Sequence, residues 1–221
     1  TLQPSTLAAP TTPPHSTWSP SLSVPYTQAP TAQASVSAPR PLDINLSTQV
    51  FDQSTGRLYF GAQPGESLGQ VLCSAGDFNK DGIADFIFGA PDASPLDRIG
   101  AGTTYIVFGT SDGSVINDLS SIGLETPGFR IFGAAEGVMS GRSVASAGDF
   151  NGDGFADVLI GAPAAKYQGT AYYGLVYVIF GQYGRSYADV ELRNFTSGPS
   201  TGFRVIGTSL MQLGFALNRA G

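Results

Sequence analysis

Hydrophobic and polar positions alternate in short segments along most of the chain beyond its first 44 residues. In residues 128–133, Phe129 and Ile131 flank Arg130, and residues 202–207 repeat the pattern with Val in place of Ile. A period of two places alternate side chains on opposite faces of a strand. Both segments are therefore expected to be half-buried β-strands.

Four strand-like segments follow one another twice along the chain. The second in each set, residues 86–88 and 158–160, is apolar throughout, as expected of a strand buried on both faces. Four antiparallel strands make one blade of a β-propeller. The sequence therefore predicts an all-β fold of β-propeller blades, each a four-stranded antiparallel sheet, that is incomplete in this chain. The predicted strands lie in residues 67–76, 86–88, 103–109 and 128–133, and again in 139–148, 158–160, 175–181 and 202–207.

A carboxylate-rich segment occurs at the same place in each set. The copies begin at Asp77 and Asp149, 72 residues apart, and each reads Asp-Phe-Asn-x-Asp-Gly-x-Ala-Asp. Carboxylates at positions 1, 5 and 9, an amide oxygen at 3 and a carbonyl at 7 can converge on one ion, and calcium accepts about six to eight such oxygens. Magnesium is disfavoured because it requires a strict octahedron. The candidate Ca2+ ligands are Asp77, Asn79, Asp81, the Ile83 carbonyl and Asp85, and then Asp149, Asn151, Asp153, the Phe155 carbonyl and Asp157.

Two other kinds of loop have similar sequences. An EF-hand loop requires a bidentate Glu at position 12 between two helices. Position 12 is Phe88 in the first copy and Ile160 in the second, both inside apolar strand segments, which excludes an EF-hand. A turn without metal is the remaining alternative, since Asp, Asn and Gly favour turns by themselves. Two copies in matching surroundings favour the cation.

The repeat also sets the expected boundaries along the chain. Gly221 stands where Gly76 and Gly148 stand before the acidic segments, so the next residue of an uninterrupted repeat would begin a third one. Closed propellers have about four to eight blades, and we expect this chain to be a piece of a longer protein. The predicted parts are a blade edge at 51–66, repeats at 67–133 and 139–207, and a partial repeat at 208–221.

The first 41 residues have a different composition from the rest. They are rich in Ser, Thr, Pro and Ala and contain no acidic residue. Such a stretch cannot bury enough apolar surface to offset the entropy of the chain. The sequence therefore predicts a disordered linker over residues 1–41 and repeats of the propeller over 42–221.

Charge and cysteine content restrict the partners. The formal net charge is −6, and six of the 17 acidic residues lie in the two acidic segments. Nucleic-acid binding relies on Lys and Arg that neutralise phosphates, so no nucleic-acid partner is expected. The longest apolar runs are shorter than a bilayer requires, so no membrane insertion is expected. Cys73 is the single cysteine, which excludes a disulfide within the chain.

The order of these motifs resembles the FG-GAP repeat of integrin α-subunit N-terminal β-propellers, which also occurs in secreted bacterial proteins and in a glycosylphosphatidylinositol-specific phospholipase D. Residues 89–91 and 161–163 match its Gly-Ala-Pro half. The resemblance covers about residues 55–221, and implies a propeller of about seven blades with calcium in the turn between the first two strands of a blade. The positions of the Phe-Gly half are held by Leu68-Gly69, Ser140-Gly141 and Leu213-Gly214.

These observations together predict a calcium-binding extracellular module for cell adhesion or protein–protein interaction, with a protein or a cell-surface or matrix component as partner. No catalysis is expected, because the chain has no Cys/His pair outside residues 1–41 and no His-Glu-x-x-His motif. The alternative function is the non-catalytic propeller of a secreted hydrolase such as that phospholipase D. Asn45 and Asn194 begin glycosylation sequons, which would make the protein a glycoprotein.

Overall fold

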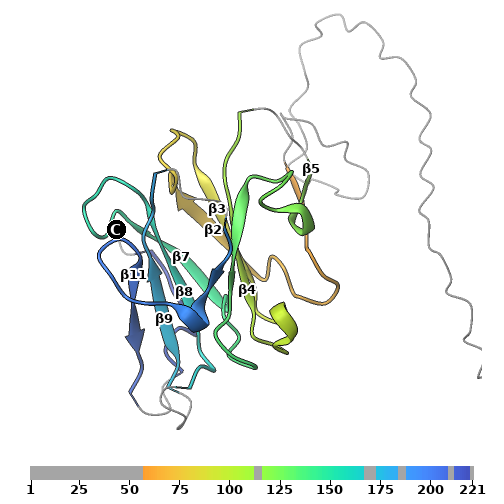
Figure 1. Cartoon of the computed structure of the whole chain (residues 1–221), viewed down its shortest axis with the longest axis vertical. Coiled ribbons are helices and arrows are strands. Elements are labelled where there is room, and N and C mark those ends of the chain that lie inside the picture. Colours follow the sequence, from red (N-terminus) through yellow and green to blue (C-terminus); the bar gives the residue numbers. More distant parts are fainter. Residues whose placement is uncertain (1–56, 112–115, 167–172, 184–187, 209–211, 220–221) are drawn as a thin grey trace, which may run out of the picture. The chain divides into compact units, whose positions relative to one another are not determined.

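The structure is a computed structural model that describes residues 57–111, 116–166, 173–183, 188–208 and 212–219 (Figure 1). The linker predicted for residues 1–41 and the start of the predicted blade edge, residues 51–56, lie outside this range. The described residues form β-strands and three short 3-10 turns, without an α-helix. No helix in the described part is long and apolar enough to cross a bilayer.

The first predicted repeat forms one antiparallel sheet. Its four strands are β2 (Val71–Gly76), β3 (Asp85–Ala90), β4 (Thr103–Val107) and β6 (Gly128–Phe132). Each of these four strands pairs with the next of the four, in the order β2-β3-β4-β6, while β5 belongs to another sheet. This up-and-down meander is the arrangement expected of a propeller blade.

The second repeat forms the same sheet again. It contains β7 (Ser143–Gly148), β8 (Asp157–Ala162), β9 (Leu175–Ile179) and β11 (Gly202–Ile206), paired in the order β7-β8-β9-β11. The register shifts by one residue near the end of the first strand in both sheets. The prediction of four-stranded antiparallel blades is confirmed, and the strand pairs β2-β3 and β7-β8 each hold one acidic segment in their connection.

A short parallel strand ties each repeat to the one before it. After β9, the two residues of β10 (Val190–Glu191) pair with β6 of the first blade, and the 3-10 turn η3 (Leu192–Asn194) follows. In the same way β5 (Ile116–Asp118) pairs with β1 (Leu58–Phe60) and is followed by η2 (Leu119–Ser121). β1 therefore takes the place that β6 takes for β10, as a strand of a preceding blade.

The core lies on both faces of the first blade. On β4, Ile106 faces the second blade and packs in a cluster with Ile160 and Tyr177. Its neighbour Tyr105 points to the opposite face and packs with Leu119 of η2. All five residues of β4, and all five of β9, are buried. On β3, Ile87 belongs to the first of these clusters and Phe88 to the second, so the prediction that residues 86–88 are buried on both faces is confirmed.

Glycine contacts set the distance between consecutive repeats. Gly89, the first residue of Gly-Ala-Pro in β3, lies so close to Gly141 that a Cβ would overlap the Gly141 carbonyl oxygen and the Val71 side chain. Gly161 meets the carbonyl of Gly214 in the same way, one repeat later. Within the second repeat, Gly141 N donates a hydrogen bond of 3.0 Å to Gly161 O. The glycines of both halves of the motif therefore pack against one another between repeats.

A partly buried ion pair joins the same two repeats farther along the blades. Arg98, in the connection between β3 and β4, is 8% exposed, and its Nη1 lies 3.1 Å from Oε2 of Glu191 in β10. The pair fixes the short strand of the second repeat to the first repeat, beside the backbone pairing of β10 with β6.

The close approach of the repeats predicts a specific cost for Gly89→Ala. Because the added methyl overlaps backbone of the next repeat, which cannot rotate away, the substitution should lower the free energy of unfolding by about 1–3 kcal/mol. Urea denaturation of the chain measures this. Gly198→Ala is the control, since its Cβ meets only the Thr201 hydroxyl at 3.2 Å, and it should cost no more than about 0.5 kcal/mol. Equal costs for the two variants would contradict the packing role of Gly89.

Candidate functional site

The two acidic segments form loops of the same conformation. The first connects β2 to β3 and the second connects β7 to β8. Both turn at glycines with positive φ, Gly82 and Gly154, each at 87°. This left-handed conformation is strained for other residues, which explains the glycine at position 6 of each copy.

In the first loop, the predicted ligand side chains hold the loop's own backbone. The carboxylate of Asp77 accepts hydrogen bonds of 3.0 Å from the amides of Asp81 and Gly82. Asn79 Oδ1 accepts a second bond from Asp81 N, and its Nδ2 donates to Asp81 Oδ2. Asp81 Oδ1 in turn accepts from Ile83 N at 2.8 Å. Three of the five predicted ligands are thus gathered around one turn.

The second loop repeats this network bond for bond. The carboxylate of Asp149 accepts from the amides of Asp153 and Gly154 at 3.0 and 2.9 Å. Asn151 accepts from Asp153 N and donates to Asp153 Oδ2, and Asp153 Oδ1 accepts from Phe155 N at 2.9 Å. The agreement shows that the nine-residue sequence determines the local conformation.

The last aspartate of each segment has a different setting. Asp85 is fully buried at the start of β3, and its two oxygens accept from Phe78 N and from Gly109 N, both at 2.8 Å. It therefore ties the start of the loop to the residues that follow β4. Burial raises the pKa of Asp85 to about 6, against the opposing effect of the two amide hydrogen bonds. A nearby cation would favour the charged form of such a carboxyl.

Asp157 occupies the same place in the second blade. It is also fully buried and accepts from Phe150 N at 2.7 Å and Gly181 N at 2.9 Å. Burial raises its pKa as well. The sequence analysis grouped both residues with the other ligands and did not anticipate that they also anchor the loops. Each is the first residue of an apolar strand, and this position could have indicated that the aspartate is buried.

The donor atoms fit a hard cation by their chemistry. Every side-chain candidate offers oxygen, and a carboxylate has about four lone-pair sites, of which the amide hydrogen bonds use only a part. As the loops stand, the described residues contain no group of three or more His, Cys, Asp or Glu side chains gathered closely enough to hold a metal ion. The amide oxygens of Asn79 and Asn151 and the carbonyls of Ile83 and Phe155 would have to complete each site.

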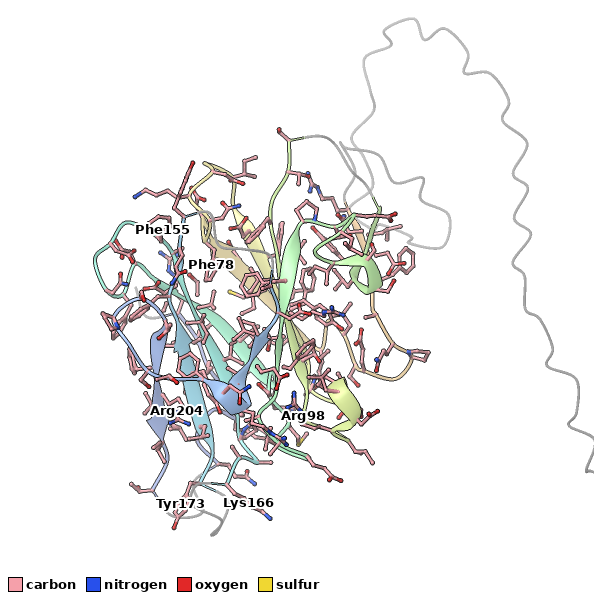
Figure 2. All side chains as sticks on the ribbon, viewed as in Figure 1. Phe78, Arg98, Phe155, Lys166, Tyr173 and Arg204 are labelled. Atoms are coloured by element: carbon pink, nitrogen blue, oxygen red, sulfur yellow. The ribbon has the colours of Figure 1, made fainter. Side chains whose placement is uncertain are left out.

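The two loops are in contact with one another. Ala156 N donates to Asp77 O at 3.2 Å, which joins the loop backbones directly. The Lys80 ammonium lies 4.6 Å from the centre of the Phe155 ring, in a cation–π contact, and a Cβ on Gly154 would meet it at 2.6 Å. Figure 2 shows Phe78 and Phe155 at the same end of the two blades. The first loop thus places a positive charge against the second.

Lys80 was not identified from the sequence. It occupies the variable position 4 with φ of 61°, where the second loop has Gly152 at 76°. Both residues have positive φ. The sequence did offer an indication, because position 4 is a lysine in the first loop and a glycine in the second. Because of this difference the two loops have unequal electrostatic surroundings.

Comparison with known proteins gives a consistent result. The FG-GAP repeat family model matches residues 68–115 and 140–179, so the chain contains FG-GAP repeats. Phosphatidylinositol-glycan-specific phospholipase D of Bos taurus is 37% identical over 130 residues, and the human protein is 38% identical over 126. Each match covers 56% of this chain and 14% of the phospholipase. Integrin alpha-PS5 of Drosophila melanogaster is 37% identical over 123 residues, 56% of this chain and 11% of the integrin.

The anchoring role of the buried aspartates predicts the effect of Asp157→Ala. The substitution leaves the amides of Phe150 and Gly181 without their acceptor, so the free energy of unfolding should fall by about 2–4 kcal/mol. Urea denaturation in the presence of EDTA measures this independently of any cation. Asp157→Asn retains one acceptor oxygen and should lose less. The exposed Glu125→Ala is the control, within about 0.5 kcal/mol of the parent. A loss for Asp157→Ala no larger than for the control would contradict the anchoring role.

Proposed function

We propose that this chain, which contains FG-GAP repeats, is part of a calcium-stabilised β-propeller module that binds a protein partner outside the cell. The observation that carries the proposal is the duplicated oxygen-rich loop, with the same hydrogen-bond network in both blades. The two loops present the same five oxygen-bearing ligand candidates in the same arrangement. Binding of one cation in each loop would explain why both copies combine these groups.

Bound calcium would supply a double positive charge among carboxylates that otherwise repel one another. In the first loop, the half-buried Asp77 and the exposed Asp81 would offer carboxylate oxygens, and Asn79 would offer a neutral amide oxygen. Asp85 would link the site to the amide of Gly109 at the end of β4. Through these contacts the chain's own residues would hold the connection between the first two strands to the middle of the blade. The role proposed for calcium is therefore structural.

Binding to a protein partner is supported by the relatives and by the fold. Integrin alpha subunits match the repeat region, with identities of 31–37% over 103 to 123 residues. A propeller positions its connecting loops on rigid strands, and such loops commonly carry binding residues. Cell adhesion and an extracellular location are proposed by analogy with these relatives. Asn194, which begins a sequon, is exposed on η3, so a glycan there would not disturb the core.

The second candidate function is a non-catalytic propeller within a phospholipase. It is favoured by the identity of 37–39% to phosphatidylinositol-glycan-specific phospholipases D of four mammals. In this case the module would position an enzyme that lies elsewhere in the protein. The complete reading frame separates the two candidates, because the adhesion proposal requires further repeats without a hydrolase domain.

The calcium proposal predicts two binding sites in the chain. Isothermal titration of the EDTA-treated protein with CaCl2 should give a stoichiometry of two, with dissociation constants of about 10⁻⁴–10⁻³ M. The second site should be the weaker, because the Lys80 ammonium lies against its loop. Asp81→Asn should abolish one site and Asp153→Asn the other. In each case a charged ligand is lost, while the side chain keeps its size and one acceptor oxygen for the amide of Ile83 or Phe155.

Matched controls place the same change outside the loops. Asp97→Asn and Asp118→Asn each remove one acidic charge from other turns of the chain, and both should leave the stoichiometry at two. Heats that are the same with and without the two loop substitutions would overturn the calcium proposal.

A further inference from the structure

Two cavities occupy equivalent places in the two repeats. The first has a volume of about 270 Å³ and the second about 170 Å³. Ala62 and Ala93 line the first, and Ala134 and Ala165, each 72 residues later, line the second. Both cavities lie where the connection before the first strand meets the connection between the second and third strands. The blade architecture therefore produces such a cavity in each repeat.

The two cavities differ in chemistry. Glu66 and Thr103 line the first, whereas Val138 and Leu175 stand at the corresponding positions of the second. Since Val and Leu satisfy the fold in one repeat, the polar residues of the other are not required by the architecture. Their presence needs a different explanation, and binding of a polar ligand is the simplest one.

Glu66 is held rigidly in place. Its side chain is almost fully buried, with 3% exposure, and Oε1 accepts from Ala62 N at 2.7 Å. Oε2 accepts from the Tyr105 hydroxyl at 2.7 Å. Burial, followed by this contact with Glu66, raises the pKa of Tyr105, so its hydroxyl remains a donor. Gly61 leaves room for the carboxylate, because a Cβ there would overlap Oε1. Glu66 is thus a fixed acceptor, and each of its oxygens has a lone pair that can accept a further hydrogen bond.

The opposite side of the cavity holds a fixed donor and an aromatic ring. Arg130 forms a two-pronged ion pair with Asp189, with Nε–Oδ2 at 3.1 Å and Nη2–Oδ2 at 2.7 Å. These contacts engage Nε and Nη2 of a group with five N–H donors in all. Phe132 lies on the same strand, and the guanidinium carbon of Arg130 is 5.4 Å from its ring centre. Glu66 and Asp189 carry two negative charges against the one positive charge of Arg130, so the three groups together carry a net charge of −1.

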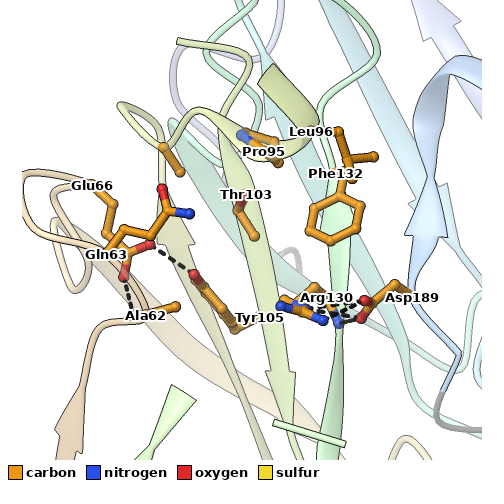
Figure 3. A pocket seen from close by; sticks show the side chains of 11 residues that line it. Ala62, Gln63, Glu66, Pro95, Leu96, Thr103, Tyr105, Arg130, Phe132 and Asp189 are labelled. Atoms are coloured by element: carbon orange, nitrogen blue, oxygen red, sulfur yellow. Dashed lines mark hydrogen bonds and ion pairs between the residues drawn. The ribbon is translucent and has the colours of Figure 1, made fainter. Parts of the chain in front are cut away.

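Figure 3 shows how these groups face one another. The Gln63 amide and the Glu66 carboxylate lie on one side of the cavity, and the Phe132 ring and Leu96 lie on the other. Thr103 lies between them, and the Arg130 guanidinium lies on the Phe132 side, next to Asp189. Acceptors, donors and an aromatic surface therefore surround a single small space.

We propose that this cavity binds one pyranose ring, either as a free sugar or as the end of a glycan. A pyranose is neutral and carries hydroxyls that both donate and accept, so it matches Glu66, Gln63 and Arg130 together. Its C–H face suits the negative face of the Phe132 ring. The volume lies near the lower limit of ligand sites, about 300 Å³, which suits one small unit.

Other simple ligands fit less well. A cation would meet the guanidinium of Arg130 beside the ring, and an anion would meet the carboxylates of Glu66 and Asp189. A purely apolar ligand would leave the buried Glu66 oxygens and the guanidinium without partners for their remaining lone pairs and N–H groups. The site is separate from the acidic loops, so its test does not depend on calcium.

The experiment titrates the 15N-labelled chain with methyl glycosides of glucose, galactose, mannose and N-acetylglucosamine, and follows amide resonances by NMR. At least one glycoside should shift the resonances of Gln63, Glu66 and Thr103, with a dissociation constant of about 1–10 mM. A second arm presents the best sugar at the end of an oligosaccharide. Tighter binding there identifies a glycan end as the ligand, and equal binding identifies the single sugar.

Substitutions by the residues at equivalent positions of the second repeat test whether Glu66 and Gln63 bind the sugar. Glu66→Val should weaken binding about tenfold or more, and Gln63→Ala, which copies Ala135, about two- to fivefold. Gln63 is exposed, so its loss should leave folding intact even if Glu66→Val does not. Glu136→Gln, which lines the second cavity, is the control and should leave binding unchanged. The absence of any shift at about 50 mM glycoside, or shifts unaffected by Gln63→Ala and Glu66→Val, would overturn the proposal.

Discussion

The contact between glycines of consecutive repeats is the constraint on which the rest of the structure depends. Gly89 and Gly161 lie against the backbone of Gly141 and Gly214, at a distance that leaves no room for a side chain. This approach brings the first strand of one blade beside the sheet before it, so that the apolar faces of β3 and β4 meet those of β7 and β8. The short strands β5 and β10 then reach across to the preceding blade.

The same packing brings the acidic loops together. Each loop holds its shape through its own carboxylates, and each is tied by a buried aspartate to the end of the third strand. Because the blades are close, Ala156 donates to Asp77 and Lys80 reaches the ring of Phe155. The loops are therefore parts of one surface, and a charge bound in one would affect the other.

The main strands and their grouping into two blades could be predicted from the sequence, because period-two alternation indicates strands and the 72-residue repeat indicates blades. The segments β5 and β10 could not, since two or three residues carry no periodicity and their pairing depends on the neighbouring blade. The ion pair of Arg130 with Asp189 could not be predicted either, because the alternating pattern of residues 128–133 places Arg130 on a face without indicating its partner. Asp189 lies in a different repeat, 59 residues away, so no local pattern indicates the contact.

The central claim is that the duplicated loops are cation sites on adjacent blades. Anomalous X-ray diffraction from crystals of the chain grown with calcium tests it most directly. The account predicts one anomalous peak in each loop, the first among the oxygens of Asp77, Asn79 and Asp81 and the second among those of Asp149, Asn151 and Asp153. Loops that are ordered but without a peak, or peaks that lie only at other carboxylates of the chain, would contradict it.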